Sequence, residues 1–269
     1  MTDLQFEKFK KIIEKEFGNT VSQDKRTTLE IKVDKIIKRY HGGTISVDQL
    51  LKKIEEEGKH SRTWETFVDE ITVHKTNFYR ENAHFDYIEK NITKIMDEIP
   101  RIRQNREIRV WCAAASSGEE PYSIAMMLKE ILPPGYNIKF LASDISEKVL
   151  AKAIAGVYPK DIEHDVPANR LEKYFDKLPS GEYCVKDELK NLVTFRKVNL
   201  CDPFIFKHKF DIVFCRNVMI YFDEDLRLNI LKKIHNDLVD NGVLLLGLSE
   251  TIGNKCDFFK LQGSSIYKK

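Results

Sequence analysis

Three apolar runs in the sequence are each followed by polar residues that could bind a ligand. The first run leads through small residues to Glu119 and Glu120, the second ends at Asp144, and the third ends at Arg216-Asn217. If these runs are parallel strands, their carboxyl ends meet at one edge of a sheet, which is where α/β proteins bind ligands. The sequence therefore predicts one crevice that contains carboxylates, an arginine and an amide.

The chemistry of these residues indicates which ligand the crevice accepts. The loop before Glu119 has neither the Gly-x-Gly-x-x-Gly pattern nor a Walker A lysine, and two carboxylates at the start of a helix disfavour phosphate. They suit an amine or another positive group. An acid such as Asp144 at the end of the second strand is typical of ribose binding. A phosphate-free ligand with a ribose, an adenine and a cationic amino-acid end describes S-adenosylmethionine (SAM).

Each residue also has a simpler structural explanation. Glu119 and Glu120 could only complement the dipole of the helix that they begin. Asp144 could cap the next helix, and Asn217 could be a turn residue. The convergence of three such strand ends favours a binding site over three separate coincidences.

The elements that position these residues follow from the apolar periodicity. The first ~70 residues show only the 3-4 spacing of amphipathic helices. From Ile108 onward, apolar strands alternate with amphipathic helices, a pattern typical of βαβ units and of a parallel sheet covered on both faces. The segment Asp257–Tyr267 is predicted to be a closing hairpin. The expected helices in the first part are Phe6–Phe17, Leu29–His41, Ser46–Glu57 and Thr63–Thr72.

Composition excludes several classes of protein. The chain has 269 residues, 42% of them hydrophobic, and a formal net charge of +2, which disfavours binding to nucleic acid by bulk attraction. No apolar run approaches the ~20 residues of a membrane span, and the N-terminus does not resemble a signal peptide. The five cysteines have no zinc or disulfide spacing. We therefore expect a cytoplasmic protein with free thiols, no bound metal and no membrane insertion.

The sequence resembles the chemotaxis receptor glutamate O-methyltransferases, the CheR family, over nearly its whole length. Three motifs carry the resemblance: residues 72–80 (TVHKTNFYR), 113–123 (AAASSGEEPYS) and 215–222 (CRNVMIYF). The resemblance implies a Rossmann-like class I methyltransferase sheet with a small helical N-terminal domain and a small antiparallel β insertion. The implied domains are residues 1–75 (helical), 76–105 (linker) and 106–269 (SAM-dependent methyltransferase), with the insertion at 176–191.

Matching the family motifs residue by residue implies a set of cofactor contacts. The family commonly has asparagine where this chain has His74, so that contact departs from the family motif. The residues implied to bind SAM are His74, Thr76, Arg80, Glu119, Asp144, Asn199, Leu200, Asn217 and Val218.

The implied reaction is displacement at the sulfonium methyl by a glutamate oxygen. A carboxylate with a pKa of ~4.3 is ionised at neutral pH, so no general base is required. Alignment of the two reactants is the main task of the protein, and it can contribute ~7–11 kcal/mol. Arg80 and Tyr221 are the predicted catalytic residues, which orient the incoming carboxylate. A structural salt bridge for Arg80 and a core position for Tyr221 are the alternatives.

Two features concern the partner. Basic residues gather on the predicted second helix, at Lys32, Lys35, Lys38 and Arg39, and are expected to contact the acidic methylation region of a chemoreceptor; an ordinary solvated helix face is the alternative. In some family members the insertion binds a pentapeptide at the receptor's C-terminus. Here residues 176–189 are a few residues shorter, so we expect no need for that tether. We also expect a monomer.

Three other functions compete with this interpretation. A nicotinamide dehydrogenase would need a phosphate-binding glycine turn, which Glu119 and Glu120 argue against. A methyltransferase that acts on nucleic acid or a small molecule would share the cofactor site, but the chain has no N-P-P-Y or D-P-P-Y sequence after the apolar run that leads to Arg216-Asn217. A non-catalytic receptor-binding module is the third.

Overall fold

The computed structural model describes all 269 residues, and the chain up to Ile71 forms a helical unit. The predicted apolar stripes, such as Phe6, Phe9 and Phe17 of the first helix, meet in a core of 16 buried residues. Thr2 and Ser46 cap their helices with reciprocal side-chain and backbone hydrogen bonds. The elements are α1 (Asp3–Phe17), η1 (Gln23–Lys25), α2 (Arg26–His41), α3 (Val47–Glu56) and α4 (Arg62–Ile71).

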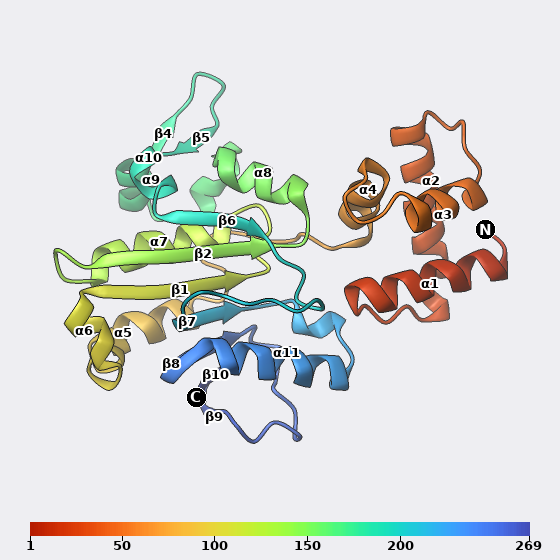
Figure 1. The fold of residues 1–269 in the computed structure, drawn as a ribbon. Helices are drawn as coiled ribbons and strands as arrows, with labels where there is room; N and C mark the ends of the chain where they lie inside the picture. The colour runs from red at the N-terminus through yellow and green to blue at the C-terminus, as the bar shows by residue number, and fades with distance from the viewer.

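The rest of the chain is built on a seven-stranded sheet in the order β6-β2-β1-β7-β8-β10-β9. The first five strands in this order are parallel, β10 pairs antiparallel with β8, and β9 pairs antiparallel with β10. The parallel strands point toward the helical unit, which lies beyond their carboxyl ends (Figure 1). The strands are β1 (Glu107–Ala113), β2 (Asn137–Asp144), β6 (Val193–Lys197), β7 (Phe210–Cys215), β8 (Leu238–Leu246), β9 (Lys260–Gly263) and β10 (Ile266–Lys268).

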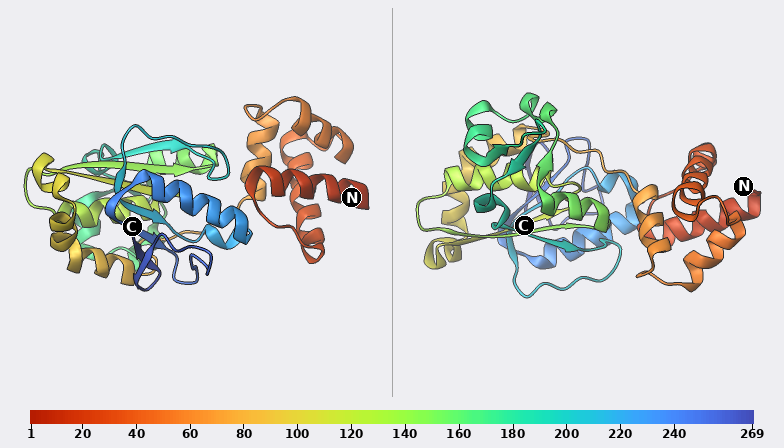
Figure 2. Two further views of the ribbon diagram at one scale, coloured as in Figure 1. Left: turned by 60° about the horizontal axis from the view of Figure 1, so that its bottom comes forward. Right: turned by 90° about the horizontal axis from the view of Figure 1, so that it is seen from above.

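Both faces of the sheet are covered, which explains why its central strands are apolar throughout. Val110 and Cys112 of β1 belong to a core of 36 buried residues, whereas Trp111 and Ala113 belong to a second core of 17. This alternation reflects the two-residue period of a strand. The views in Figure 2 show helices on either side of the sheet. The helices include α5 (Ala83–Glu98), α6 (Pro100–Asn105), α7 (Glu119–Ile131), α8 (Glu147–Ala155) and α11 (Glu224–Asp237).

A second, three-stranded antiparallel sheet has the order β3-β5-β4. It contains the predicted insertion, together with a two-residue strand from earlier in the chain. It stands next to α8 at one side of the large sheet (Figure 1). Its elements are β3 (Val157–Tyr158), η2 (Lys160–His164), α9 (Ala168–Tyr174), β4 (Phe175–Lys177), β5 (Tyr183–Val185) and α10 (Asp187–Lys190).

The helical unit and the sheet are joined by residues 72–82, which contain no helix or strand. The following helices, α5 and α6, contribute Ile88, Ile95 and Ile102 to the large core of the sheet. Most of the segment 76–105 is thus packed on the sheet. No helix in the structure is both long and apolar enough to cross a lipid bilayer.

Candidate cofactor and acceptor site

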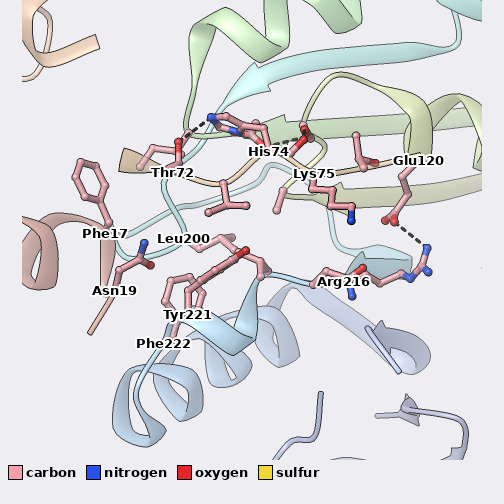
Figure 3. Close-up of a pocket in the computed structure, with 18 of the residues that line it drawn as sticks. Phe17, Asn19, Thr72, His74, Lys75, Glu120, Leu200, Arg216, Tyr221 and Phe222 are labelled. Carbon is pink, nitrogen blue, oxygen red and sulfur yellow. Dashed lines mark hydrogen bonds and ion pairs between the residues drawn. The ribbon is translucent and has the colours of Figure 1, made fainter. Parts of the chain in front are cut away.

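A cavity lies at the carboxyl edge of the sheet, facing the helical unit. It contains about 880 Å³ of empty space, part of which opens to solvent. Its walls come from the connection 72–80, the loops after β1, β2, β6 and β7, and the C-terminal end of α1 (Figure 3). Nine of the ten predicted site residues line it: His74, Thr76, Arg80, Asp144, Asn199, Leu200, Asn217, Val218 and Tyr221.

The loop after β1 approaches the neighbouring elements closely. Ala114 and Ser116 have positive φ values of 62° and 49°, which is unusual for residues with a side chain. Gly118 has a φ of 98°, and a Cβ there would lie 2.7 Å from the Tyr158 hydroxyl. Only glycine fits this position. Because Ala114 and Ser116 carry small side chains, the loop leaves room for a ligand beside its backbone.

Asp144 ends β2 and is only 7% exposed. Its Oδ2 accepts a hydrogen bond of 2.8 Å from the backbone N–H of Ser116, and its Oδ1 accepts one of 3.0 Å from that of Ser146. The N-cap of α8 is Ser146, so Asp144 does not have the capping role that was its alternative. Burial raises the pKa of Asp144, although these hydrogen bonds oppose the effect. Its fixed carboxylate faces the cavity with lone pairs free for hydroxyl donors.

Glu120, rather than Glu119, presents its side chain to the cavity. Glu119 accepts a hydrogen bond of 2.7 Å from the Ser117 hydroxyl and begins α7, as the dipole explanation expected. The side chain of Glu120 is 11% exposed, and burial raises its pKa. Of the two adjacent acids, Glu120 therefore lines the cavity and Glu119 does not.

Arg216 forms a buried ion pair with Glu120 at one end of the cavity. Its Nη1 donates to Glu120 Oε2 at 2.7 Å (Figure 3). Its Nη2 donates to Glu81 Oε2 at 2.9 Å. The side chain of Arg216 is fully buried, yet its Nε–H has no partner. Arg216 thus lies between two acids that balance its charge, and the Glu120 carboxylate is left at this end of the cavity as a group that a cationic ligand could contact.

Asn217 follows in a left-handed conformation, with a φ of 57°. The carboxylate of Glu250 stabilises this turn by accepting the backbone N–H groups of Asn217 at 2.8 Å, Ile220 at 3.2 Å and Gly247 at 2.6 Å. A Cβ on Gly247 would lie 2.5 Å from Asn217 Nδ2. Asn217 is thus both a turn residue, as its alternative proposed, and a lining residue of the cavity.

The connection 72–80 forms another wall. His74 Nε2 lies 2.8 Å from the Thr72 hydroxyl, and the His74 carbonyl accepts a hydrogen bond of 3.0 Å from Ser116 Oγ. Arg80 donates from Nη1 to the Lys75 carbonyl at 3.1 Å. It forms no ion pair with any carboxylate of the chain, so the structural salt bridge that was its alternative is not present.

The helical unit completes the cavity with Phe17 and Asn19, which the sequence analysis did not identify. Asn199 connects the two parts, because its Nδ2 donates to the Glu16 carbonyl at 2.9 Å. The same Asn199 accepts a hydrogen bond of 3.0 Å from the Cys201 N–H through Oδ1. Phe17 belongs to the predicted apolar stripe of the first helix, and no local sequence pattern marks it as a site residue.

A second hollow, which we call the lateral groove, opens beside the cavity between the helical unit and the loop after β7. It contains about 1070 Å³ of empty space, open to solvent. Tyr221, in η3 (Met219–Tyr221), lines both the cavity and the groove. The two hollows also share Asn19, Val73 and Phe222. The remaining groove residues are Ile13, Thr20, Val21, Lys25, Thr28, Leu29, Lys32, Ile71 and Ile220.

Comparison with known proteins identifies the family. Residues 74–268 match the family described as CheR methyltransferase, SAM binding domain. This chain belongs to the CheR methyltransferase family. A chemotaxis protein methyltransferase of Borreliella burgdorferi is 40% identical over 250 residues, which cover 91% of this chain and 87% of that protein. The chemotaxis protein methyltransferase of Escherichia coli K12 is 33% identical, and the match covers 99% of this chain and 91% of that protein. Chemotaxis protein methyltransferase Cher2 of Pseudomonas putida is also 33% identical, with 96% and 94% covered.

Membership confirms several predictions. The fold is the Rossmann-like methyltransferase sheet with a helical N-terminus, and the chain is a SAM-dependent methyltransferase of chemotaxis. The nicotinamide dehydrogenase is thereby excluded. The cavity fits this cofactor, because the buried acid Asp144 ends β2 and a second buried acid, Glu120, also lines the cavity.

Proposed function

We propose that this CheR methyltransferase methylates glutamate side chains of chemoreceptors and so forms glutamyl methyl esters. The observation that carries the proposal is the position of Tyr221, which lines the cavity on one side and the lateral groove on the other. A side chain that enters from the groove would meet the cofactor at Tyr221. The groove carries Lys25 and Lys32, which favours an acidic partner.

The cofactor contacts are proposed from the walls of the cavity. Asp144 would bind the ribose hydroxyls, and Glu120 would bind the ammonium group in place of Glu119. When bound, SAM supplies a methyl group on a sulfonium centre. The remaining predicted contacts stay proposals, with Asn199-Leu200 beside the adenine: His74, Thr76, Arg80, Asn199, Leu200, Asn217 and Val218.

Arg80 and Tyr221 are proposed to orient the acceptor carboxylate. The guanidinium of Arg80 has no acidic partner within the chain and can form a two-point contact with a carboxylate. The Tyr221 hydroxyl can donate one further hydrogen bond, and burial raises the pKa of Tyr221, which keeps this donor protonated. The acceptor is already ionised at neutral pH, so orientation and exclusion of water are sufficient.

The proposed docking surface on α2 is partly neutralised by the chain itself. Lys35 pairs with Glu70 at 2.6 Å and Lys38 pairs with Asp34 at 2.7 Å. Lys32 donates to the Ile71 carbonyl at 3.0 Å. Arg39 has no ion pair, so we propose that it makes the strongest contribution of the four to binding an acidic receptor helix.

We propose that the enzyme does not need a receptor pentapeptide tether, because residues 176–189 are a few residues shorter than in the family members that bind it. We also propose that it works as a monomer in the cytoplasm, where its five free cysteines would stay reduced. Calorimetry with a receptor C-terminal pentapeptide tests the first point. We expect no binding, and micromolar affinity would contradict it.

The direct experiment is incubation with methyl-labelled SAM and membranes that contain chemoreceptors. We expect label on the receptors that alkali releases as methanol, because carboxyl esters hydrolyse in base. Stable label would contradict the proposed ester and indicate another acceptor group. Absence of transfer, with normal cofactor binding, would favour a receptor-binding module without catalysis.

A further inference from the structure

Glu81, the residue after Arg80, joins three segments that surround the cavity. Its Oε1 accepts a hydrogen bond of 3.0 Å from Asn217 Nδ2. Its Oε2 accepts one of 2.9 Å from Arg216 Nη2 and one of 3.0 Å from the backbone N–H of Leu248. One carboxylate therefore ties the connection 72–82 to the loops after β7 and β8.

The backbone at this point is held in an uncommon conformation. Tyr79 and Glu81 have positive φ values of 51° and 59°. Such residues persist where the surrounding structure fixes them, and they cluster at functional sites. Two contacts fix this segment, since the Arg80 carbonyl accepts a hydrogen bond from Arg216 Nη2 and the Tyr79 N–H donates to Ser123 Oγ at 3.1 Å. The strain is thus located where Arg80 must project toward the cavity.

The charge of Glu81 matches this role. Its side chain is 16% exposed and lies against the fully buried Arg216. Burial opposes ionisation, but hydrogen bonds from Asn217 and Arg216 outweigh it and hold the pKa of Glu81 below its ordinary value. An ionised carboxylate accepts all three hydrogen bonds at once, which a neutral amide cannot do.

We propose that Glu81 is a positioning residue for the cofactor: it orients the Asn217 amide and the backbone of Arg80 from outside the cavity. Glu81 does not line the cavity, whereas Arg80, Arg216 and Asn217 all do. The inference rests on the proposed cofactor contacts of Asn217 and Arg80. It adds Glu81 as the group that holds Asn217 and Arg80 in position.

The substitution Glu81→Gln tests the idea with little change in shape. Its NH₂ group must face either the Asn217 amide or the donors of Arg216 and Leu248, so at least one contact is lost. Glu98→Gln is the matched control, because Glu98 Oε2 pairs with Lys268 at 2.8 Å and is also partly buried, far from the cavity. Glu81→Asp, which keeps the charge but shortens the reach, serves as a second variant if Glu81→Gln does not fold.

The measurement is calorimetric binding of S-adenosylhomocysteine, the demethylated product, well below the melting temperature of each variant. We expect Glu81→Gln and Glu81→Asp to raise the Kd by about tenfold or more, as for loss of a hydrogen bond to a charged group. Glu98→Gln should keep the wild-type Kd, because its partly exposed ion pair with Lys268 lies outside the lining of the cavity. Wild-type affinity in both Glu81 variants would overturn the inference.

A double substitution separates this inference from the proposed function. In an Asn217→Ala background, Glu81→Gln should have a smaller effect on the Kd, because Glu81 acts in part through Asn217. If Glu81→Gln changed the Kd equally in the wild-type and Asn217→Ala backgrounds, Glu81 would not act through Asn217. Wild-type affinity in Asn217→Ala alone would overturn the proposed cofactor contact and the inference built on it. Loss in Asn217→Ala without loss in the Glu81 variants would leave the contact intact and overturn only the inference.

Discussion

Arg216 Nη1 lies 2.7 Å from Glu120 Oε2, and this ion pair forms one end of the cofactor cavity. Both side chains are buried, so removing one partner would leave an uncompensated charge. The pair fixes Glu120 at the start of α7, where its carboxylate faces the cavity while that of Glu119 turns to Ser117. Binding of a cationic amino-acid group is therefore expected to depend on the second of two adjacent glutamates.

The first prediction compares these neighbours. Glu120→Gln should weaken binding of S-adenosylhomocysteine by about 10–100-fold, since a hydrogen bond to a charged group contributes about 1.5–3 kcal/mol. Glu119→Gln is the matched control and should change affinity by less than about threefold, because its carboxylate contacts Ser117 instead. Calorimetry measures both. A larger loss of affinity in Glu119→Gln than in Glu120→Gln would instead identify Glu119 as the cofactor ligand.

The second prediction concerns pH. Burial raises the pKa of Glu120 and of Asp144. The ionised forms bind the cofactor, so protonation competes with binding, and affinity should fall as the pH drops from neutral. Because both pKa values are raised, the fall should begin above the ordinary carboxyl value of ~4.3. Titration calorimetry across this range checks the effect, and Glu120→Gln should show a weaker pH dependence than the wild type. An affinity unchanged down to the ordinary value would contradict it.

The raised carboxyl pKa values also predict the sign of one stability effect. A carboxyl group whose pKa is higher in the folded protein than in the unfolded chain stabilises the folded state when it is protonated. This contribution to the free energy of unfolding is fully present below the pKa of the unfolded state, and it is lost as the pH rises through the pKa of the folded state. The bound cofactor offsets that loss, so ligand-induced stabilisation should increase with pH over this range. Melting temperatures with and without S-adenosylhomocysteine measure it, and a shift that shrinks with rising pH would be inconsistent with the raised values.

The third prediction concerns orientation of the acceptor. Arg80→Ala should lower kcat by about 100-fold or more with the fold retained, because a misplaced reactant loses most of the benefit of alignment. Tyr221→Phe should cost about tenfold, as for one lost hydrogen bond. Receptor methylation rates, with circular dichroism as the control for folding, provide the measurement. Wild-type turnover in Arg80→Ala would remove the residue from the proposed mechanism.

The fourth prediction concerns receptor docking. Charge reversal by Lys35→Glu with Arg39→Glu should slow receptor methylation by about threefold or more, mainly through slower association, and the effect should shrink at high salt. Arg39→Glu alone should account for most of it, since Lys35 already pairs with Glu70. Lys8→Glu, an exposed reversal on α1, is the control. Equal rates in all variants would eliminate the α2 surface as the docking site.

The sequence predicted those parts of the site that follow from strand ends. Asp144 and Asn217 each come directly after an apolar run, and the carboxyl ends of parallel strands meet at one edge. The choice between Glu119 and Glu120 was not predictable in the same way. Adjacent helix residues differ by about 100° around the axis, so only the exact start of α7 decides which one faces the cavity.

Other features could not be predicted from the sequence, because they depend on contacts between distant segments. Phe17 fits the apolar stripe of α1 equally well as a pure core residue, and only the position of the helical unit brings it to the cavity. Glu250 gives no local sign that it will hold three backbone N–H groups. The first part of β8, which starts at Leu238, has no strand signal in the sequence, because Asp240-Asn241 inside it have the composition of a turn. The two-residue strand β3 is too short for a periodic signal.

The most direct test of the proposed activity is the location of the methyl group. Receptors incubated with the enzyme and SAM should yield peptides that carry one added methyl, and fragment mass spectra should place it on a glutamate side chain. The same peptides from the Arg80→Ala enzyme should carry far less. A methyl found on a lysine, an asparagine or an amino terminus, with none on glutamate, would contradict the account.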